Sequence, residues 1–342
     1  MFRRISKMLS VIFCLLAAAL LVANWLLTDY LETPLELQRS LTIKVPAGTS
    51  LTAQARQMEK EGLLKWSRVL TVYGRLSGQT GIKAGEYLLH PGDTPRELLA
   101  KWVRGDVIQY SLTFPEGLTF SDWLLLLANV EKLEQVLTPG SQQHILEQLG
   151  AEISHPEGWF FPDTYSYSEG DTDRDILLRA HQRMREVLAE EWSSRSSGLP
   201  YDDPYEALIM ASIIEKETGV AEERGQIAGV FVRRLQKGMR LQTDPTVIYG
   251  LGDAYKGNIR RKHLRQHSDY NTYLIKGLPP TPIAMPGREA IHAALHPEDG
   301  NSLFFVAKGD GSHYFSATLE EHQKAVREFQ LQRRSDYRSQ PK

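Results

Sequence analysis

The chain has 342 residues, of which 42% are hydrophobic and 24% charged, with 40 Lys and Arg against 42 Asp and Glu. This length is enough for two domains, and the interspersed basic and acidic residues give no indication of a nucleic-acid-binding surface. Cys14 is the only cysteine, so no disulfide can form within the chain and its domains must be stabilised by ordinary cores.

The N-terminal region predicts a membrane-spanning helix over residues 8–27. This stretch carries no charged side chain, and at about 1.5 Å per residue it would span about 30 Å, the thickness of a bilayer's hydrocarbon core. Arg3, Arg4 and Lys7 precede it, which favours a cytoplasmic N-terminus over residues 1–7 and export of the rest of the chain. The alternative is a cleaved signal peptide, which the length of the apolar stretch disfavours.

Residues 28–40 are predicted to be a short polar spacer. After it, a strand-like run followed by Pro, Gly and an amphipathic helix recurs at residues 45–51 and 114–120, with a looser copy at residues 90–95. Such strand–turn–helix units make small α+β modules, and the sequence predicts one over residues 41–106. The alternative is that helix entry signals merely resemble one another.

A larger mixed α+β domain is predicted over residues 107–342. Strand-like stretches lie at residues 108–114 and 303–308, and a charged helical tail is expected at residues 319–333. Further helices are predicted around residues 119–131, 172–191, 204–217, 221–237 and 287–296. The predicted fold class is therefore α+β, with one transmembrane helix, a small module and a larger domain.

One of these helices carries the clearest chemical signal. Asp203 followed by Pro204 is a strong helix start, and Gly219 is a strong stop. Residues 207–214 are apolar on nearly every face, so this helix is expected to be buried rather than to lie on a surface.

Two carboxylates, Glu215 and Glu217, stand at the C-terminal end of that helix. Desolvation and the negative end of the helix dipole both disfavour ionisation there, so a carboxyl tends to stay protonated near neutral pH. A protonated carboxyl is the group that a departing glycosidic oxygen requires. The two side chains point about 200° apart around the helix, so only one of them can face a given cleft. The sequence does not show which, and it also allows both to be solvated.

Glycan binding needs polar groups beside aromatic platforms. Residues 158–165, 242–246 and 270–273 have this character, although each could equally form a corner of the core with its hydroxyls satisfied internally.

Five motifs occur in this chain in an order that is found in a known family. They lie at residues 157–165, 211–218, 241–250, 270–273 and 277–280. Together they resemble the YceG-like family of endolytic murein transglycosylases, and the resemblance covers the whole chain. Within it, residues 41–106 correspond to a LysM-like module and residues 107–342 to the catalytic domain.

The resemblance implies an enzyme that cleaves the MurNAc–GlcNAc β-1,4 bond in peptidoglycan strands near the membrane and leaves 1,6-anhydroMurNAc ends. It places the catalytic residue at the second glutamate of the Glu-Lys-Glu motif, Glu217. The implied site needs no metal and no cofactor. The candidates for binding the substrate are Gln242, Thr243, Asp244, Tyr270, Asn271 and Glu215.

The resemblance also implies a place in the cell. The anchor would hold the chain in the bacterial inner membrane, with the catalytic domain in the periplasm and nascent glycan strands as the partner. Peptidoglycan synthases are further possible partners, and cleavage of nascent strands could terminate their elongation.

The residues also allow two other hypotheses about function. His292 and His296, and also His263 and His267, are four apart and could share a helix face in a metal site, but neither pair has the HExxH pattern. The stronger alternative is a membrane-tethered, non-catalytic scaffold of the wall-building machinery that binds peptidoglycan without cutting it.

Overall fold

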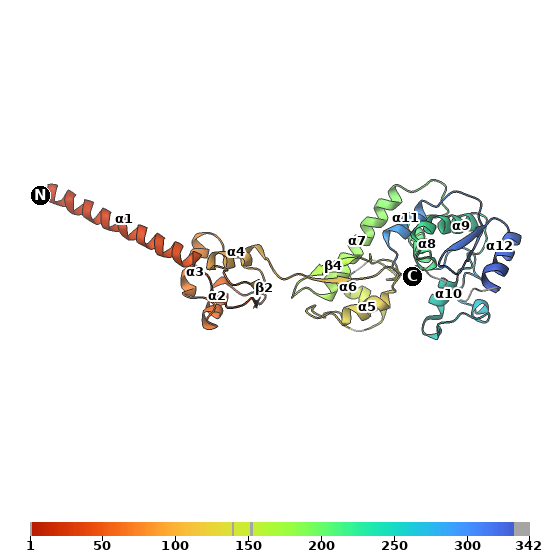
Figure 1. The fold of residues 1–342 in the computed structure, drawn as a ribbon, viewed down its shortest axis with the longest axis horizontal. Helices are drawn as coiled ribbons and strands as arrows, with labels where there is room; N and C mark the ends of the chain where they lie inside the picture. The colour runs from red at the N-terminus through yellow and green to blue at the C-terminus, as the bar shows by residue number, and fades with distance from the viewer. Residues whose placement is uncertain (1, 139, 151–152, 332–342) are drawn as a thin grey trace. The chain divides into compact units, whose positions relative to one another are not determined.

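The computed structural model describes residues 2–138, 140–150 and 153–331. It divides into two compact units. The first unit comprises the chain as far as Tyr110 together with Lys132–Glu134 and Ser166–Asp171, and the second holds the remainder. Each unit combines helices with short strands (Figure 1), which confirms the predicted α+β class. The two later segments of the first unit were not expected from the sequence, which placed a domain boundary after residue 106.

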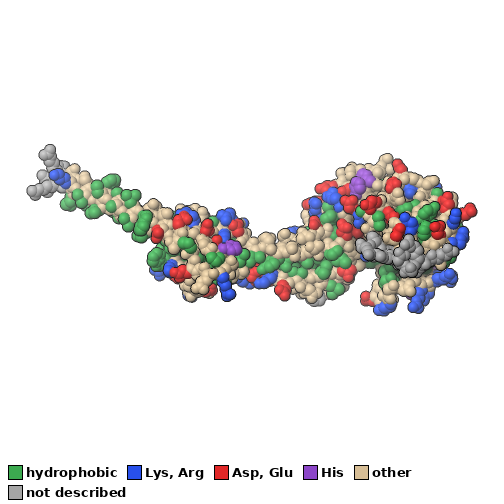
Figure 2. Space-filling model, viewed as in Figure 1, with side chains coloured by type: hydrophobic (Ala, Val, Ile, Leu, Met, Phe, Trp, Pro, Cys, Tyr) green, Lys and Arg blue, Asp and Glu red, His purple; other side chains and the backbone are tan. Residues whose placement is uncertain are grey.

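The first unit begins with helix α1 (Phe2–Glu32). Between Ile5 and Glu32 this helix is long and apolar enough to cross a membrane, with a mean hydropathy of 2.4 in its most apolar window. Hydrophobic side chains cover its exposed surface (Figure 2). The helix therefore fits the transmembrane segment that the sequence predicts.

A small α+β module follows α1. Strands β1 (Leu41–Val45) and β2 (Gly85–Leu89) pair antiparallel, with Leu41 opposite Leu89. Helices α2 (Leu51–Lys60), α3 (Ser67–Leu76) and α4 (Pro95–Arg104) complete it. Its core includes Ala55, Met58, Leu70, Tyr87, Leu98, Leu99 and Trp102, all fully buried.

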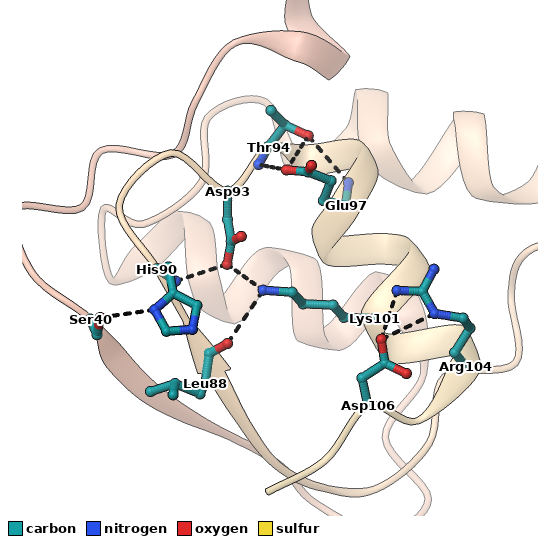
Figure 3. A network of polar contacts seen from close by, with 9 residues as sticks. All are labelled: Ser40, Leu88, His90, Asp93, Thr94, Glu97, Lys101, Arg104 and Asp106. Atoms are coloured by element: carbon teal, nitrogen blue, oxygen red, sulfur yellow. Dashed lines mark hydrogen bonds and ion pairs between the residues drawn. The ribbon is translucent and has the colours of Figure 1, made fainter.

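Polar contacts fix the turn that leads from β2 into α4 (Figure 3). Thr94 caps α4 in a reciprocal arrangement with Glu97. Asp93 accepts hydrogen bonds from the backbone N–H of His90 at 2.8 Å and from Lys101 Nζ at 2.5 Å. The Pro-Gly turn in the sequence thus leads directly into a helix start, as its residues indicate.

The predicted polar spacer differs from what the structure shows. Helix α1 continues to Glu32, and Tyr30, Leu31 and Leu35 are buried in the core of the first unit. The Tyr30 hydroxyl donates to the carbonyl of Lys65 at 2.8 Å. These apolar side chains pack into the module because burial removes their surface from water, so part of the stretch belongs to the folded unit.

Strands β3 (Tyr110–Thr113) and β4 (Thr164–Tyr167) form a two-stranded sheet. The second unit then contains helices α5 (Phe120–Ala128), α6 (Gln142–Leu149), α7 (Asp173–Ser193), α8 (Pro204–Glu217), α9 (Arg224–Gln236), α10 (Asp244–Leu251) and α11 (Arg288–Leu295). Short 3₁₀ turns lie at Ala221–Glu223, Gly252–Ala254 and His263–Arg265. Helices α6 and α10 were not predicted from the sequence.

The C-terminal part adds the antiparallel strands β5 (Phe304–Ala307) and β6 (His313–Ser316), then helix α12 (Leu319–Val326). A π-helical turn, Arg327–Leu331, continues α12. The predicted tail reached residue 333, and its last two residues lie outside the described part of the chain.

Helix α8 lies at the centre of the second unit. It packs against α7, α9, α10 and α11, and every residue from Ala207 to Ile214 is buried. Asp203 caps its first turn, with Pro204 at the first helical position. The helix ends at Glu217 because Thr218 is already extended, one residue before the expected stop at Gly219. The buried, uniformly apolar helix is as predicted.

Candidate active site

A cavity of about 630 Å³ opens beside the C-terminal end of α8, within the second unit. Glu217 lies in its wall, together with residues from α9, the start of α10, β5 and α12. The cavity combines polar and aromatic side chains, including Arg234, Gln242, Asp244, Tyr273, Phe304, Phe305, His313 and His322.

The carboxyl group of Glu217 is the most perturbed acid in this wall. Burial, with a smaller contribution from the nearby negative charge of Asp244, raises its pKa to about 7. A hydrogen bond from the Thr243 hydroxyl to Glu217 Oε1 and the positive charge of Arg234 act in the opposite direction. A substantial fraction of Glu217 is therefore protonated at neutral pH, as general acid catalysis requires.

Thr243 is held rigidly behind Glu217. Its backbone N–H donates to Thr272 Oγ1 at 3.0 Å, and its carbonyl accepts from Thr246 Oγ1 at 2.9 Å. The backbone N–H of the preceding residue, Gln242, donates to the carbonyl of Thr272 at 3.2 Å. These bonds join two of the sequence motifs and fix the hydroxyl that orients the Glu217 carboxyl.

Asp244 brings a second carboxylate to the cavity. Its Oδ1 accepts a hydrogen bond from the Tyr273 hydroxyl at 2.7 Å, and both side chains line the wall. Burial raises the pKa of Tyr273, and the Asp244 carboxylate adds to this, so Tyr273 remains a hydrogen-bond donor at neutral pH.

Arg234 supplies a buried cation, with only 7% of its surface exposed. Its guanidinium donates to the carbonyls of Leu303 at 2.6 Å, Leu241 at 2.7 Å and Arg240 at 3.2 Å, and it lies 5.0 Å from the centre of the Phe304 ring. Burial lowers the pKa of this guanidinium. Arg234 thus connects the loop that precedes Thr243 to the residue just before strand β5.

Three of the predicted substrate-binding residues, Glu215, Tyr270 and Asn271, are not among the residues that line the cavity. Glu215 Oε2 accepts from the backbone N–H of Gly287 at 3.1 Å, and burial raises the pKa of this carboxyl. The Tyr270 hydroxyl is 2.8 Å from Thr281 Oγ1. Of the two glutamates at the end of α8, Glu217 is the one that lines the cavity, while Glu215 makes an internal hydrogen bond.

Asn271 is also internal. Only 1% of its surface is exposed, and its Nδ2 donates to the carbonyls of His263, Leu264 and Gln266 at 3.3, 3.3 and 2.7 Å. It therefore holds the loop after α10, while Gln242 and Asp244 line the cavity and Thr243 contacts Glu217.

Sequence reasoning missed one wall of the cavity. Arg234, Phe304 and His322 belong to no motif that pointed to glycan chemistry, and they join the site only through the packing of β5 and α12. The Nδ1 atom of His313 lies 2.7 Å from Glu223 Oε2, and this contact fixes a further part of the wall. Tyr273 lay within a recognised motif but was not singled out.

A separate cluster of Glu191, His292 and His296 has ligand atoms within 4.8 Å of one another. One carboxylate oxygen of Glu191 accepts from Arg288 at 2.7 Å, and the other lies 2.8 Å from His292 Nδ1. Because a guanidinium already neutralises the carboxylate, this geometry is that of an ion-pair network. None of these residues lines the cavity around Glu217.

These features define a class of protein: an α+β domain in which a buried central helix presents a partly protonated carboxyl to an open, aromatic-lined cleft. Residues 43–328 match the model of the YceG-like family. The chain therefore belongs to the YceG-like family.

Known members of the family are similar over most of the chain. An endolytic murein transglycosylase of Bacillus subtilis (strain 168) is 32% identical over 307 residues, which cover 85% of this chain and 85% of that protein. An endolytic murein transglycosylase of Streptococcus pneumoniae serotype 2 is 27% identical, covering 89% of this chain and 61% of that protein. A crystal structure of a YceG-like protein from Listeria monocytogenes has a TM-score of 0.51 and 31% identity, covering 84% of this chain and 99% of the other.

Proposed function

We propose that this chain is a peptidoglycan lytic transglycosylase that cuts within glycan strands. The observation that carries the proposal is the Glu217 carboxyl, whose pKa burial raises to about 7 at the wall of a 630 Å³ cleft. Membership of a family whose relatives are named endolytic murein transglycosylases supports it.

In the proposed reaction, protonated Glu217 donates its proton to the glycosidic oxygen as the bond to the anomeric carbon of MurNAc breaks. The carboxylate so formed then accepts the proton of the 6-hydroxyl of the same MurNAc. That oxygen attacks the anomeric carbon and closes the 1,6-anhydro ring. One residue acts as acid and then as base, and its protonation state is restored without water entering the products.

The surroundings of Glu217 suit both halves of this reaction. Burial favours the acid that starts the cycle, while the Thr243 hydroxyl and the charge of Arg234 stabilise the carboxylate that forms midway. The aromatic ring of Tyr273 offers an apolar face for a sugar ring, and Gln242 and Asp244 offer hydrogen-bonding groups. We assign substrate binding to Gln242 and Asp244, with Thr243 positioning the acid.

We further propose how the chain is placed. Helix α1 anchors it in the bacterial inner membrane with residues 1–7 in the cytoplasm, a LysM-like module over residues 41–106 follows, and a periplasmic catalytic domain covers residues 107–342. Anchoring would direct the enzyme to nascent strands close to the membrane, where cleavage would terminate their elongation beside peptidoglycan synthases. The apolar length of α1 supports the anchor.

The test is digestion of purified sacculi by the full chain in detergent, with mass analysis of the products. New 1,6-anhydroMurNAc ends are expected, and Glu217→Gln should lower the rate by at least about 10²-fold. Glu215→Gln is the matched control, because it changes the neighbouring carboxyl that faces Gly287 and should keep most of the activity.

Other outcomes would replace the proposal. Reducing ends in place of anhydro ends would indicate hydrolysis with Asp244 as the second carboxylate. Binding of sacculi without any new ends would establish the non-catalytic scaffold instead.

A further inference from the structure

The loop after α10 is a strongly basic part of the described surface that the proposed reaction leaves unused. Between Tyr255 and Ser268 it contains five Lys and Arg residues and no Asp or Glu, although the whole chain is nearly balanced in charge. Figure 2 shows Lys and Arg side chains gathered on the lobe that follows α10. The cationic residues of this basic loop are Lys256, Arg260, Arg261, Lys262 and Arg265.

These five side chains are exposed, and none makes an ion pair with any other residue in the described part of the chain. Like charges packed in one short loop repel one another, so the cluster costs folding energy unless a bound anion compensates it. The loop thus presents an uncompensated positive field to solvent.

The backbone of the basic loop is ordered, not a loose tether. The backbone N–H of Arg260 donates to His263 Nδ1 at 3.1 Å, and the N–H of His263 donates to the carbonyl of Arg260 at 2.8 Å. Asn271 donates to the carbonyls on both sides of Arg265, those of Leu264 and Gln266. The cations are therefore carried by a fixed turn.

That turn is joined to the active-site wall by a short path. Asn271 precedes Thr272, whose hydroxyl accepts from the backbone N–H of Thr243 at 3.0 Å, and Thr243 donates to Glu217. Tyr273, the next residue, lines the cleft. The segment that supports the basic loop through Asn271 therefore continues directly into the cleft wall at Tyr273.

We infer that the basic loop binds the acidic peptides carried by the glycan strand. Each MurNAc unit of uncleaved peptidoglycan bears a short peptide with free carboxylates, so a strand in the cleft is a line of negative charges. The exposed guanidinium and ammonium groups match these carboxylates, and their field would draw charged strands toward the site. This inference rests on the proposed function, because it takes peptidoglycan as the substrate.

Binding can be tested apart from catalysis in the full-length Glu217→Gln protein. Two ligands are compared: glycan strands with intact peptides, and the same strands after enzymatic removal of the peptides. At low salt the peptide-bearing strands should bind roughly tenfold more tightly, and about 0.5 M salt should abolish most of that difference by screening.

The double variant Arg260→Glu/Arg261→Glu should bind both strands equally. The matched control is Arg185→Glu/Lys237→Glu, which reverses two exposed cations elsewhere in the second unit and should keep the preference. Arg260→Gln/Arg261→Gln provides a neutral version should the reversed loop fail to fold.

Three binding results would overturn the inference. The parent protein could bind both strands equally, or the loop variant could lose the same affinity for both strands. The control variant could also lose the preference for peptide-bearing strands as the loop variant does. A fourth concerns the membrane. If anionic vesicles containing the full chain protect Lys256 and Lys262 from amine-reactive labelling and peptide-bearing strands do not, the loop faces lipid. Failure of the proposed function would be seen in a different experiment: the unmutated chain would produce no 1,6-anhydroMurNAc ends from any glycan strand.

Discussion

At the scale of single residues, the environment of Glu217 separates it from the carboxyl two positions earlier. Both groups are desolvated at the end of α8, but Glu215 is committed to the backbone of Gly287, whereas Glu217 opens onto the cleft. Thr243 and Arg234 moderate the effect of burial on Glu217, which leaves its pKa near the pH at which an acid must both give and take a proton.

The first prediction concerns pH. Because the proposed reaction starts from protonated Glu217, kcat/KM should fall as pH rises through about 7, roughly tenfold per unit. Thr243→Val removes a hydrogen bond that stabilises the carboxylate, so the pKa should rise and the fall in kcat/KM should move to higher pH. Thr243→Ser keeps the hydroxyl and should keep the parent profile. A fall centred near 4.5, the ordinary value, would contradict the assignment.

At the scale of elements, the segments around the cleft are fixed mainly by side chains that bond to backbone. Ser212 in the middle of α8 accepts from the N–H of Ile283 at 3.0 Å, and Asn271 donates to three carbonyls in the loop after α10. Buried bonds of this kind hold irregular backbone in place, since an unpaired buried polar group is costly.

The second prediction distinguishes a structural from a substrate-binding role for Asn271. Asn271→Ala removes a buried donor that serves the carbonyls of Leu264 and Gln266 and shares that of His263 with the N–H of Gln266. It should lower the free energy of unfolding by about 2–3 kcal/mol, as measured by denaturant titration. Asn258→Ala, an exposed asparagine in the same loop, should change it by less than about 0.5 kcal/mol. Unchanged stability with a raised KM would instead show that Asn271 contacts the glycan.

At the scale of the whole molecule, the apolar helix α1 and the small module are parts of one folded unit. Leu31 is 1% exposed, and Glu32 at the helix end pairs with Arg96 Nε at 2.6 Å. A helix that ends inside a core transmits its orientation to that core, which a free spacer would not do.

The third prediction follows from that continuity. A chain starting at residue 28 keeps Tyr30, Leu31 and Leu35, whereas one starting at residue 41 loses all three buried side chains. The shorter chain should destabilise the module by about 3–5 kcal/mol, because removing buried apolar groups leaves cavities. Hydrogen exchange of the paired strand amides at Ile43 and Tyr87 measures this, and equal protection in both chains would contradict it.

The sequence alone was sufficient for the features that rest on local patterns. The apolar length of α1, the start of α8 at Asp203 and Pro204, and the burial of residues 207–214 were all predicted correctly, because caps and periodicity act within one element. The ordered motifs likewise indicated the family.

Other features depended on contacts between distant segments. The resemblance pointed to Glu217, but only the tertiary structure showed that Glu215 makes an internal hydrogen bond and that Asn271 is buried. It also showed that Arg234, Phe304 and His322 complete the cleft. The physical reason is that desolvation and cavity shape are set by residues that meet only after folding. A carboxyl at a helix end becomes an acid suited to catalysis through what packs around it, and no local pattern encodes those neighbours.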